Sequence, residues 1–240
     1  MSEENGAARF AVILAAAGQS SRFSAKKTAG PSAKKTFVHL EGKPLWLHSA
    51  EKFNSRSDVV QIVVVVAPED IAWFRQYYLA EINRMYLIVV AGGSERVVSV
   101  RNALAAVSPK AQYVAVHDAA RPCVTQEDIE AVFQEARKTG AALLASPVVG
   151  TLKRVKDGYV ETTVNREDVW EAQTPQVFRR DILEAAYKQK MIGTPTDDSL
   201  LVELLDVPVS VVSGDRLNIK VTTPSDLFLA RWVLQSRFTP

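Results

Sequence analysis

The sequence predicts an α/β protein built on a mainly parallel sheet. Short runs rich in Val, Ile and Ala alternate with helical patterns up to residue 147. Strands that are apolar without interruption are typical of a sheet covered on both faces. Helices between such strands imply right-handed crossovers, which bring ligands to the carboxyl ends of the strands. We expect these strands at 10–17, 61–67, 86–91, 112–117 and 141–147.

The helices between these strands have recognisable ends. Pro68-Glu69-Asp70 places a proline and two carboxylates in the first turn of a helix. The N–H that proline lacks is not needed there, and negative charge is favourable at the positive end of the helix dipole. Thr125 and Asp128 come close to a capping box. The apolar stripe that follows, 129–136, ends before Gly140, a typical helix terminator.

Residues 151–178 interrupt the alternation. Asp157-Gly158 lies between two β-prone runs, 152–155 and 159–164, which indicates a hairpin. Because a two-stranded ribbon is marginal alone in water, we expect this arm to pack on its own domain or, preferably, on a second subunit. Further elements are expected as helices near 181–189 and 198–205, strands at 207–212 and 217–221, and a last helix after Thr223-Pro224. We therefore expect a single domain over residues 1–240, with 151–178 as a β-arm for dimerisation.

The composition is that of an ordinary globular chain. Of 240 residues 47% are hydrophobic, and 29 Lys and Arg nearly balance 27 Asp and Glu, so disorder is excluded and no overall field attracts nucleic acid or an anionic membrane. The longest apolar run, 10–17, is too short to span a bilayer, and Ser2-Glu3-Glu4 lacks the positive start of a signal peptide. Cys123, the single cysteine, excludes an intrachain disulfide and suits a reducing compartment. We expect a cytoplasmic protein that binds neither membrane nor nucleic acid.

A turn of small residues follows the first strand. Ala15-Ala16-Ala17-Gly18 would let backbone N–H groups approach a phosphate or nucleotide closely, although such residues also simply permit tight packing. The polar stretch 23–35 comes next and contains two pairs of lysines, Lys26-Lys27 and Lys34-Lys35. By itself this stretch is typical of a solvated surface loop. Because this stretch follows a turn that can hold a nucleotide and that ends in Arg22, it can also fold over a triphosphate.

Several separated blocks are distributed over nearly the whole chain. They are 14–22 with Lys35-Thr36-Phe37, 92–100, 116–122, 174–176, 196–198 and 218–222. In this order they resemble the blocks of the 2-C-methyl-D-erythritol 4-phosphate cytidylyltransferase family. The resemblance implies a Rossmann-like three-layer α/β nucleotidyltransferase fold with a mainly parallel sheet. It also implies a protruding β-hairpin arm that makes a homodimer.

The activity that the resemblance implies is transfer of CMP from CTP to 2-C-methyl-D-erythritol 4-phosphate. The products would be 4-diphosphocytidyl-2-C-methyl-D-erythritol and pyrophosphate, in non-mevalonate isoprenoid precursor synthesis. Because the attacking phosphate is already an anion, the protein must chiefly align two anions and neutralise charge on the five-coordinate phosphorus. Arg, Lys and Mg²⁺ suit that task. By match to the family the catalytic cations are Arg22, Lys35 and Lys220, with Lys27 as the alternative to Lys35 because the loop is longer than usual.

The same resemblance implies the nucleotide site. The Gly92-Gly93 pair would let the main chain reach the cytosine, with Ser94 and Ser99 in contact with the nucleotide, although Ser94 can also simply cap the following helix. Asp118 is expected to bind Mg²⁺ directly or through water, since a carboxylate beside phosphate needs a cation between them, or else to cap a short turn. His117 is expected to be a buried structural group. The nucleotide-binding positions are Ala16, Ala17, Gly18, Gly93, Ser94, Ser99, Asp118 and Ala119.

The acceptor site is also implied by the family. Arg121 would face the acceptor's phosphate, or alternatively form a local salt bridge. Thr151, Arg166 and Thr174 match residues that bind methylerythritol phosphate, some of them across the dimer, so that each active site is composite. Thr196 and Asp197 match the pair that contacts acceptor hydroxyls, although they also have the pattern of a helix cap and a first-turn acid.

Three alternatives remain beside this interpretation. The acceptor could be ribitol 5-phosphate or a related alditol phosphate, but residues 117–122 resemble the methylerythritol phosphate enzymes more closely. A nucleotide-binding module without catalysis would not need Arg22, Lys35, Asp118 and Lys220 together. A nucleic-acid binder would need a wider basic surface than the lysine loop provides.

Overall fold

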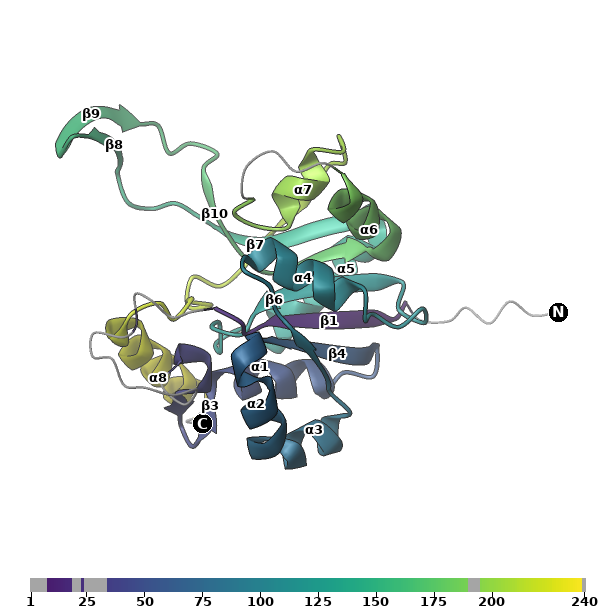
Figure 1. Ribbon diagram of the computed structural model, residues 1–240. Coiled ribbons are helices and arrows are strands. Elements are labelled where there is room, and N and C mark those ends of the chain that lie inside the picture. Colours follow the sequence, from purple (N-terminus) through teal and green to yellow (C-terminus); the bar gives the residue numbers. More distant parts are fainter. Residues whose placement is uncertain (1–7, 19–22, 24–33, 190–194, 239–240) are drawn as a thin grey trace.

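The fold is a seven-stranded sheet with helices on both faces (Figure 1). The computed structural model describes residues 8–18, 23, 34–189 and 195–238. The strand order is β11-β7-β10-β6-β1-β4-β5. These strands are β1 (Phe10–Ala15), β4 (Val59–Val66), β5 (Ile88–Ala91), β6 (Tyr113–Asp118), β7 (Ala141–Pro147), β10 (Trp170–Arg179) and β11 (Ser210–Ser213).

Alternate side chains of the central strand enter two different cores. Phe10, Val12 and Leu14 pack on the face covered by α1 (Leu45–Asn54), α2 (Ile71–Tyr77), α3 (Leu79–Met85) and α5 (Gln126–Thr139). Ala11 and Ile13 face α4 (Arg96–Leu104), α6 (Arg180–Lys188) and α7 (Ser199–Glu203). Both faces of β1 are therefore buried, which explains its uninterrupted apolar sequence.

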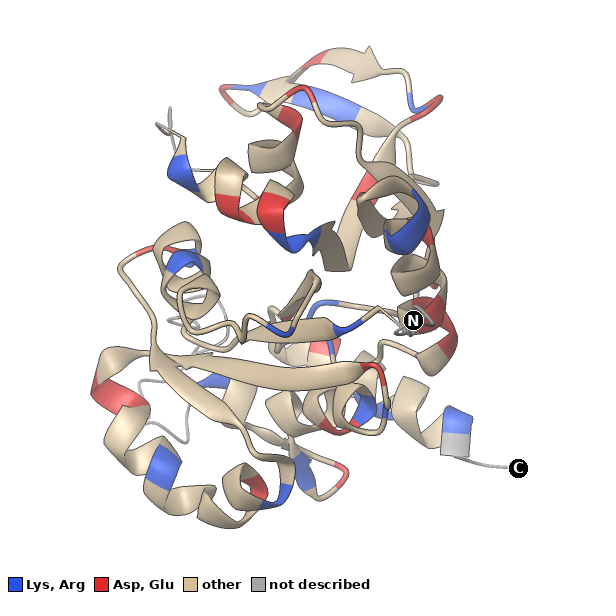
Figure 2. Cartoon of the chain, turned by 90° about the vertical axis from the view of Figure 1, so that its right-hand side faces the viewer, with Lys and Arg blue, Asp and Glu red and all other residues tan. Residues whose placement is uncertain are grey.

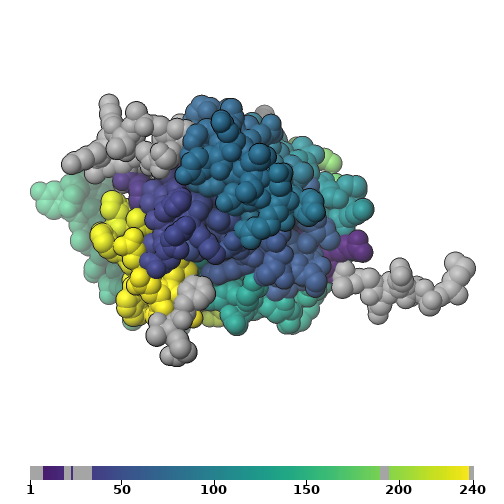
Figure 3. All heavy atoms as spheres, turned by 90° about the horizontal axis from the view of Figure 1, so that it is seen from below, coloured from purple at the N-terminus to yellow at the C-terminus, as the bar shows by residue number. Residues whose placement is uncertain are grey.

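A third, smaller core holds the last helix, α8 (Pro224–Phe238), against the N-terminal half of the chain. Leu40, Leu45 and Cys123 pack there with Val233 and other residues of α8. Figure 3 shows α8, in yellow, beside the dark blue surface of the early segments. That early segment contains η2 (Lys35–Phe37) and a small ladder of β2 (His39–Leu40) and β3 (Lys43–Pro44). A further short helix, η3 (Pro68–Asp70), precedes α2.

Four parallel strands end at one edge of the sheet. Strand β1 pairs in parallel with both β4 and β6, and β4 pairs in parallel with β5. The register places Ala15 opposite Asp118 on one side and opposite Val65 on the other. The turns that leave β1, β4, β5 and β6 consequently meet at this edge, where ligands collect in open α/β sheets.

Strand β10 is the antiparallel member of the sheet, between β6 and β7. It leads back from a hairpin of β8 (Leu152–Lys156) and β9 (Tyr159–Val164), which projects from the body of the chain (Figure 1). Asp157 and Gly158 both have positive φ, 50° and 84°, as the predicted tight turn requires. Residues 176–179 of β10 pair with β6 inside the sheet.

Most predicted elements are confirmed, including the capping box of α5. Thr125 Oγ1 accepts a hydrogen bond of 3.0 Å from the Asp128 N–H, and Gly140 ends this helix with φ 86°. The strand expected at 217–221 is wrong. The segment has no strand ladder and is held by a backbone hydrogen bond of 2.8 Å from the Val221 N–H to the Ala120 carbonyl and by the buried Asn218, whose Nδ2 donates to the Thr174 carbonyl at 3.0 Å.

The surface carries mixed charge. In Figure 2 Lys and Arg are interspersed with Asp and Glu over the helices. Within the described ranges, no helix combines the length and the apolar character needed to cross a membrane. Because the surface charge is mixed, any cluster of positive charge must be sought in a local site.

Candidate active site

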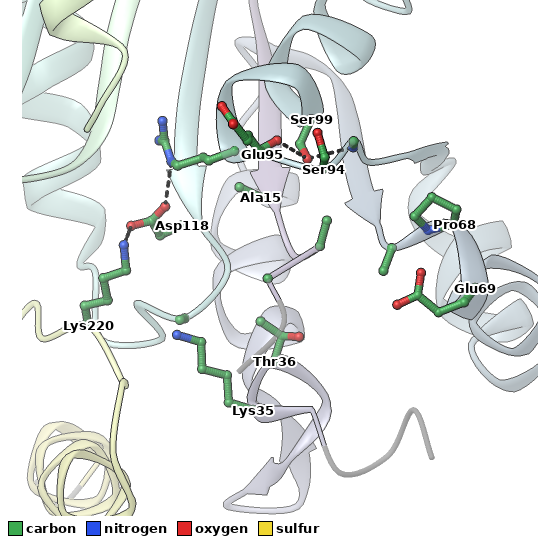
Figure 4. Close-up of a pocket in the computed structure, with 16 residues that line it drawn as sticks. Ala15, Lys35, Thr36, Pro68, Glu69, Ser94, Glu95, Ser99, Asp118 and Lys220 are labelled. Carbon is green, nitrogen blue, oxygen red and sulfur yellow. Dashed lines mark hydrogen bonds and ion pairs between the residues drawn. The ribbon is translucent and has the colours of Figure 1, made fainter. Parts of the chain in front are cut away.

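A pocket opens at the edge where the parallel strands end (Figure 4). Its walls come from the turns after β1, β4 and β5, from η2, from the end of β6 and from the segment that precedes α8. The lining residues are Ala15, Ala17, Gly18, Lys35, Thr36, Ala67, Pro68, Glu69, Gly93, Ser94, Glu95, Arg96, Ser99, Asp118, Ala120 and Lys220. The pocket thus contains most of the nucleotide positions expected from sequence, together with two of the three expected catalytic cations.

Two turns of small residues approach each other closely along one wall. A Cβ on Gly92 would lie only 2.6 Å from the Cβ of Ala17, and a Cβ on Gly93 would collide with Val98. Ser99, which is buried, accepts a hydrogen bond of 3.0 Å from the Gly93 N–H and donates one of 3.0 Å to the Glu95 carbonyl. Glycine is therefore required here by space, and Ser99 holds the turn in shape.

The interpretation of Ser94 as the helix cap is wrong. Helix α4 has Glu95 at its N-cap position, with no side-chain hydrogen bond to the helix. Ser94 is exposed and lines the pocket instead. Its hydroxyl is thus available at the position where a ligand would lie.

Asp118 is one of three acidic residues that line this pocket, with Glu69 and Glu95, and it is surrounded by cations. Its Oδ2 lies 2.6 Å from Lys220 Nζ, and its Oδ1 lies 3.5 Å from Arg96 Nε. Arg121 Nε is more distant, 3.9 Å from Oδ2. Although burial opposes ionisation, Arg96 and Lys220 hold the pKa of Asp118 well below its usual range. Asp118 is therefore a carboxylate at neutral pH.

Arg96 connects this carboxylate to a second one. Arg96 Nη2 donates to Asp198 Oδ2 at 2.6 Å, and the Tyr187 hydroxyl donates to Asp198 Oδ1 at 2.5 Å. Burial opposes the charge on Arg96, but Asp198 and Asp118 raise its pKa above the usual value. The sequence interpretation did not include Arg96 or Asp198 among the site residues. One signal was available, because Arg96 opens the helix that follows the Gly92-Gly93 turn.

His117 is a satisfied buried group, as expected. Its Nε2 lies 3.2 Å from both Ser49 Oγ and the Arg121 carbonyl, and its Nδ1 lies 3.1 Å from Thr174 Oγ1. Burial lowers the pKa of His117 to about 3. The imidazole is therefore neutral and fixes its neighbours in place.

Arg121 and Thr174 lie behind Asp118 and do not line the pocket. The Arg121 guanidinium donates to the Asn218 carbonyl at 2.7 Å and to the Ala172 carbonyl at 3.4 Å, and burial lowers its pKa. Thr174 Oγ1 accepts a hydrogen bond of 3.0 Å from the Asp118 N–H. Both side chains are buried and hold together the segments around Asp118. Their expected contact with the acceptor stays a prediction.

The lysine segment reaches the pocket through η2. The Lys35 side chain extends into the pocket in Figure 4, on the same side as Lys220 and Asp118. Thr36 Oγ1 donates to the Ala16 carbonyl at 3.4 Å, and Phe37 packs against Trp73 with ring centroids 5.2 Å apart. Arg22 and the alternative lysine, Lys27, lie outside the described residues.

The remaining expected residues lie elsewhere in the chain. Ala16 and Ala119 are buried beside the pocket without lining it, and Thr151 and Arg166 are exposed on the arm. Thr196 and Asp197 line a separate cavity together with Trp170 and other residues.

The Asp197 carboxylate accepts hydrogen bonds from Gln176 Nε2 at 2.9 Å and from the Leu200 N–H at 3.1 Å. The alternative that the sequence pattern offered, Thr196 as helix cap and Asp197 as first-turn acid, is wrong, because the N-cap residue of α7 is Asp198 and Asp197 lies before it. One chain alone therefore does not bring the expected acceptor residues into the Asp118 pocket.

Asp118 could ligate a divalent cation beside Lys220 and Arg96, which already pair with its two oxygens. In the part of the chain that the structure describes, no three His, Cys, Asp or Glu side chains gather into a metal site. Mg²⁺ commonly keeps several waters and uses one or two carboxylates with substrate phosphates. An ionised carboxylate on the wall of an open pocket matches that donor set.

Comparison with known proteins gives consistent matches over nearly the whole chain. The family model of 2-C-methyl-D-erythritol 4-phosphate cytidylyltransferase matches residues 10–236. The enzyme with that name from Solibacter usitatus is 44% identical over 95% of this chain and 96% of its own length. That from Rhodopirellula baltica is 42% identical over 96% of each. The crystal structure of the Thermus thermophilus enzyme is 28% identical, with a TM-score of 0.76, and covers 95% of this chain and 100% of that one.

Proposed function

Because the chain belongs to the 2-C-methyl-D-erythritol 4-phosphate cytidylyltransferase family, we propose that the Asp118 pocket is where it joins CTP to that acceptor. The chain is a nucleotidyltransferase of non-mevalonate isoprenoid precursor synthesis. One observation carries the assignment of the site. Lys35 and Lys220, from segments far apart in the sequence, line the same pocket as Asp118, at the carboxyl edge of the sheet and beside the turns of small residues.

The reaction needs cations more than it needs a base. A phosphate oxygen of the acceptor attacks the α-phosphorus of CTP, a new P–O bond forms, and the bond to the leaving pyrophosphate breaks. The attacking oxygen already carries charge, so the catalytic task is to align two anions and to stabilise the charge of the transition state. Lys35 and Lys220 supply ammonium groups for this purpose, and Arg22 is the third cation by resemblance to the family.

The nucleotide would lie along the small-residue wall. Ala17 and Gly18 allow the triphosphate to approach the backbone, and Gly93 brings main-chain groups toward the cytosine. Ser94 offers a hydroxyl at the pocket surface. Ser99 acts by fixing the Gly93 N–H, to which it is already bonded. The close fit of Gly92 against Ala17 supports this assignment, since without bulky side chains the backbone of both turns is accessible to a ligand.

Asp118 is the residue that would hold Mg²⁺. The ion would neutralise phosphate charge when bound. The chain's own preparation for it is the ionised state of Asp118, which Arg96 and Lys220 maintain. Arg96 is also bonded to Asp198, so the Arg96 guanidinium keeps its place beside the phosphates.

The acceptor would be bound by a homodimer. We assign Arg121, Thr174, Thr196 and Asp197 to the acceptor site by resemblance, with Thr151 and Arg166 reaching into the partner's pocket. The projecting hairpin supports this arrangement, because the exposed arm carries Thr151 and Arg166 away from the pocket of its own chain. Arginine is suited to a bidentate grip on a terminal phosphate.

An acceptor assay tests the proposed function. Purified chain is incubated with CTP, Mg²⁺ and either methylerythritol phosphate or ribitol 5-phosphate, and pyrophosphate release is followed. We expect rapid release with methylerythritol phosphate and little with ribitol 5-phosphate. The opposite preference would refute the substrate assignment, and a Lys35→Ala variant with unchanged turnover would refute the site.

A further inference from the structure

We propose that Lys34 is a positioning residue, whose ion pair with Asp70 fixes the short η2 turn and thereby aims Lys35 into the reaction pocket. This inference rests on the proposed function of the pocket. The two adjacent lysines then have different tasks. Lys35 acts on the reacting phosphates, and Lys34 holds the backbone.

The Lys34 side chain is paired with two residues of η3. Lys34 Nζ lies 2.5 Å from Asp70 Oδ2 and 2.8 Å from Glu69 Oε1. The Asp70 side chain is only 4% exposed and that of Lys34 is 18% exposed, whereas Glu69 is largely in solvent. The pair with Asp70 is therefore partly buried and well defined, unlike a typical surface salt bridge.

The neighbours of Lys35 are held on both sides. On one side, Lys34 is tied to Asp70, and its carbonyl accepts a hydrogen bond of 2.9 Å from the Phe37 N–H. On the other side, Thr36 is bonded to the Ala16 carbonyl, and the Phe37 ring packs among aromatic side chains of α2 and the turn after it. The backbone of η2, which is only three residues long, is thus held on both sides of Lys35, and the close-up shows the Lys35 side chain entering the pocket (Figure 4).

A lysine side chain is long and flexible, so its catalytic value depends on where its backbone is held. A misplacement of about 1 Å can cost on the order of a hundredfold in rate. Loss of the Lys34–Asp70 ion pair should therefore misplace Lys35 and reduce turnover, with less effect on the affinity for CTP. A second explanation must be separated from this one, because Lys34 also neutralises Glu69, which lines the pocket and would otherwise repel an anion.

The experiment compares kcat and KM for CTP in wild type, Lys34→Met, Lys35→Ala and the double variant. We expect Lys34→Met to lower kcat about tenfold. We expect the double variant to be no slower than Lys35→Ala, because groups that act as a unit are not additive. Lys43→Ala is the matched control, since it breaks an exposed lysine–carboxylate pair of 2.6 Å with Glu51 outside the pocket. Its kcat should equal that of wild type.

Three outcomes would overturn the positioning role. One is an unchanged kcat in Lys34→Met while Lys35→Ala is impaired. Another is a double variant whose two losses multiply. The third is a Lys34→Met defect that appears only in KM for CTP and is removed by adding Glu69→Gln, which would leave charge neutralisation as the whole effect.

Hydrogen exchange gives a readout that does not need activity. The Phe37 amide should exchange faster in Lys34→Met than in wild type or Lys43→Ala, because it is bonded to the Lys34 carbonyl. Equal exchange rates would refute the claim that Lys34 holds the η2 turn. If wild type released no pyrophosphate at all, the proposed function would fail, while the exchange comparison would still decide whether Lys34 holds the turn.

Discussion

Lys220 Nζ lies 2.6 Å from Asp118 Oδ2, which joins the segment before the last helix to the end of a central strand. Asp118 takes its backbone position from Thr174 and its charge balance from Lys220 and Arg96. The carboxylate therefore places two cations at the pocket wall before any substrate arrives. Preorganised charge of this kind needs little rearrangement during a reaction.

Lys220→Met should fold normally and lose turnover. Asp118 is only 10% exposed but keeps Arg96 as a partner, so the fold should tolerate the loss of Lys220, whereas removal of one preorganised cation should lower kcat about a hundredfold. Pyrophosphate release measures the effect. Lys138→Ala, which removes an exposed ammonium on α5, should match wild type. A Lys220→Met enzyme with wild-type kcat would remove Lys220 from the mechanism.

His117 should make the protein less stable in acid. Burial lowers the pKa of His117 to about 3, while an unfolded histidine titrates near ~6.5, so the unfolded chain binds the extra proton between these values. The free energy of unfolding should thus fall as pH decreases through this window, by up to about 1.4 kcal/mol per pH unit from this residue.

Urea unfolding at a series of pH values checks this prediction. His117→Gln should show a shallower dependence on pH than wild type, because it removes the titrating group. His39→Gln, which changes an exposed histidine, should keep the wild-type slope. Equal slopes for all three proteins would mean that His117 does not stay neutral in the folded state.

Tyr187→Phe should destabilise the fold. The buried hydroxyl donates to Asp198 Oδ1 at 2.5 Å, and its loss leaves a buried carboxylate with one donor fewer, at a cost of about 1–3 kcal/mol. Tyr86→Phe removes a hydroxyl from a side chain that is 87% exposed and should change nothing measurable. Denaturant titration of both variants gives the comparison. If both variants matched wild type, Asp198 would not depend on Tyr187.

Mixed subunits should restore activity if each site is composite. Lys35→Ala and Arg166→Ala proteins should each be impaired, whereas after exchange at equal amounts about a quarter of the sites would be intact in a two-fold dimer. Turnover of the mixture, with heterodimers confirmed by native mass spectrometry, measures this. Confirmed heterodimers without recovered activity would place Arg166 in the site of its own chain.

Local patterns made much of the fold predictable. The apolar strands, the capping box at Thr125 and the Asp157-Gly158 turn depend on nearby residues, and all three are confirmed. Gly92 and Gly93 were identified through the resemblance to the family, and the structure adds that a Cβ there would collide with Ala17 or Val98. These signals were sufficient to predict the edge of the sheet at which the pocket opens.

Features that depend on distant partners were not predictable in this way. Arg96 gains its place from Asp198 and Tyr187, which lie on other elements, and no spacing in the sequence links the three. Residues 217–221 have the composition of a strand but are held by the side chain of Asn218 and by a backbone hydrogen bond to Ala120. The difference between Lys34 and Lys35 likewise depends on Asp70, a residue that local sequence does not connect to them.

Strand β10 gives the arm and the pocket very different tolerance to insertions and deletions. The chain passes from the hairpin through Trp170–Ala172, which pair with β7, to Gln176, which pairs with both β6 and β7. Extra residues at the Asp157-Gly158 tip would lengthen the ribbon and leave Thr174 beside Asp118. The stretch between Ala172 and Gln176 departs from regular pairing with β7 and carries Thr174, so a deletion there would move Thr174 relative to the Asp118 N–H. We therefore expect an insertion at the tip of the arm to leave the Asp118 pocket intact, whereas a change of length between Ala172 and Gln176 should disturb it.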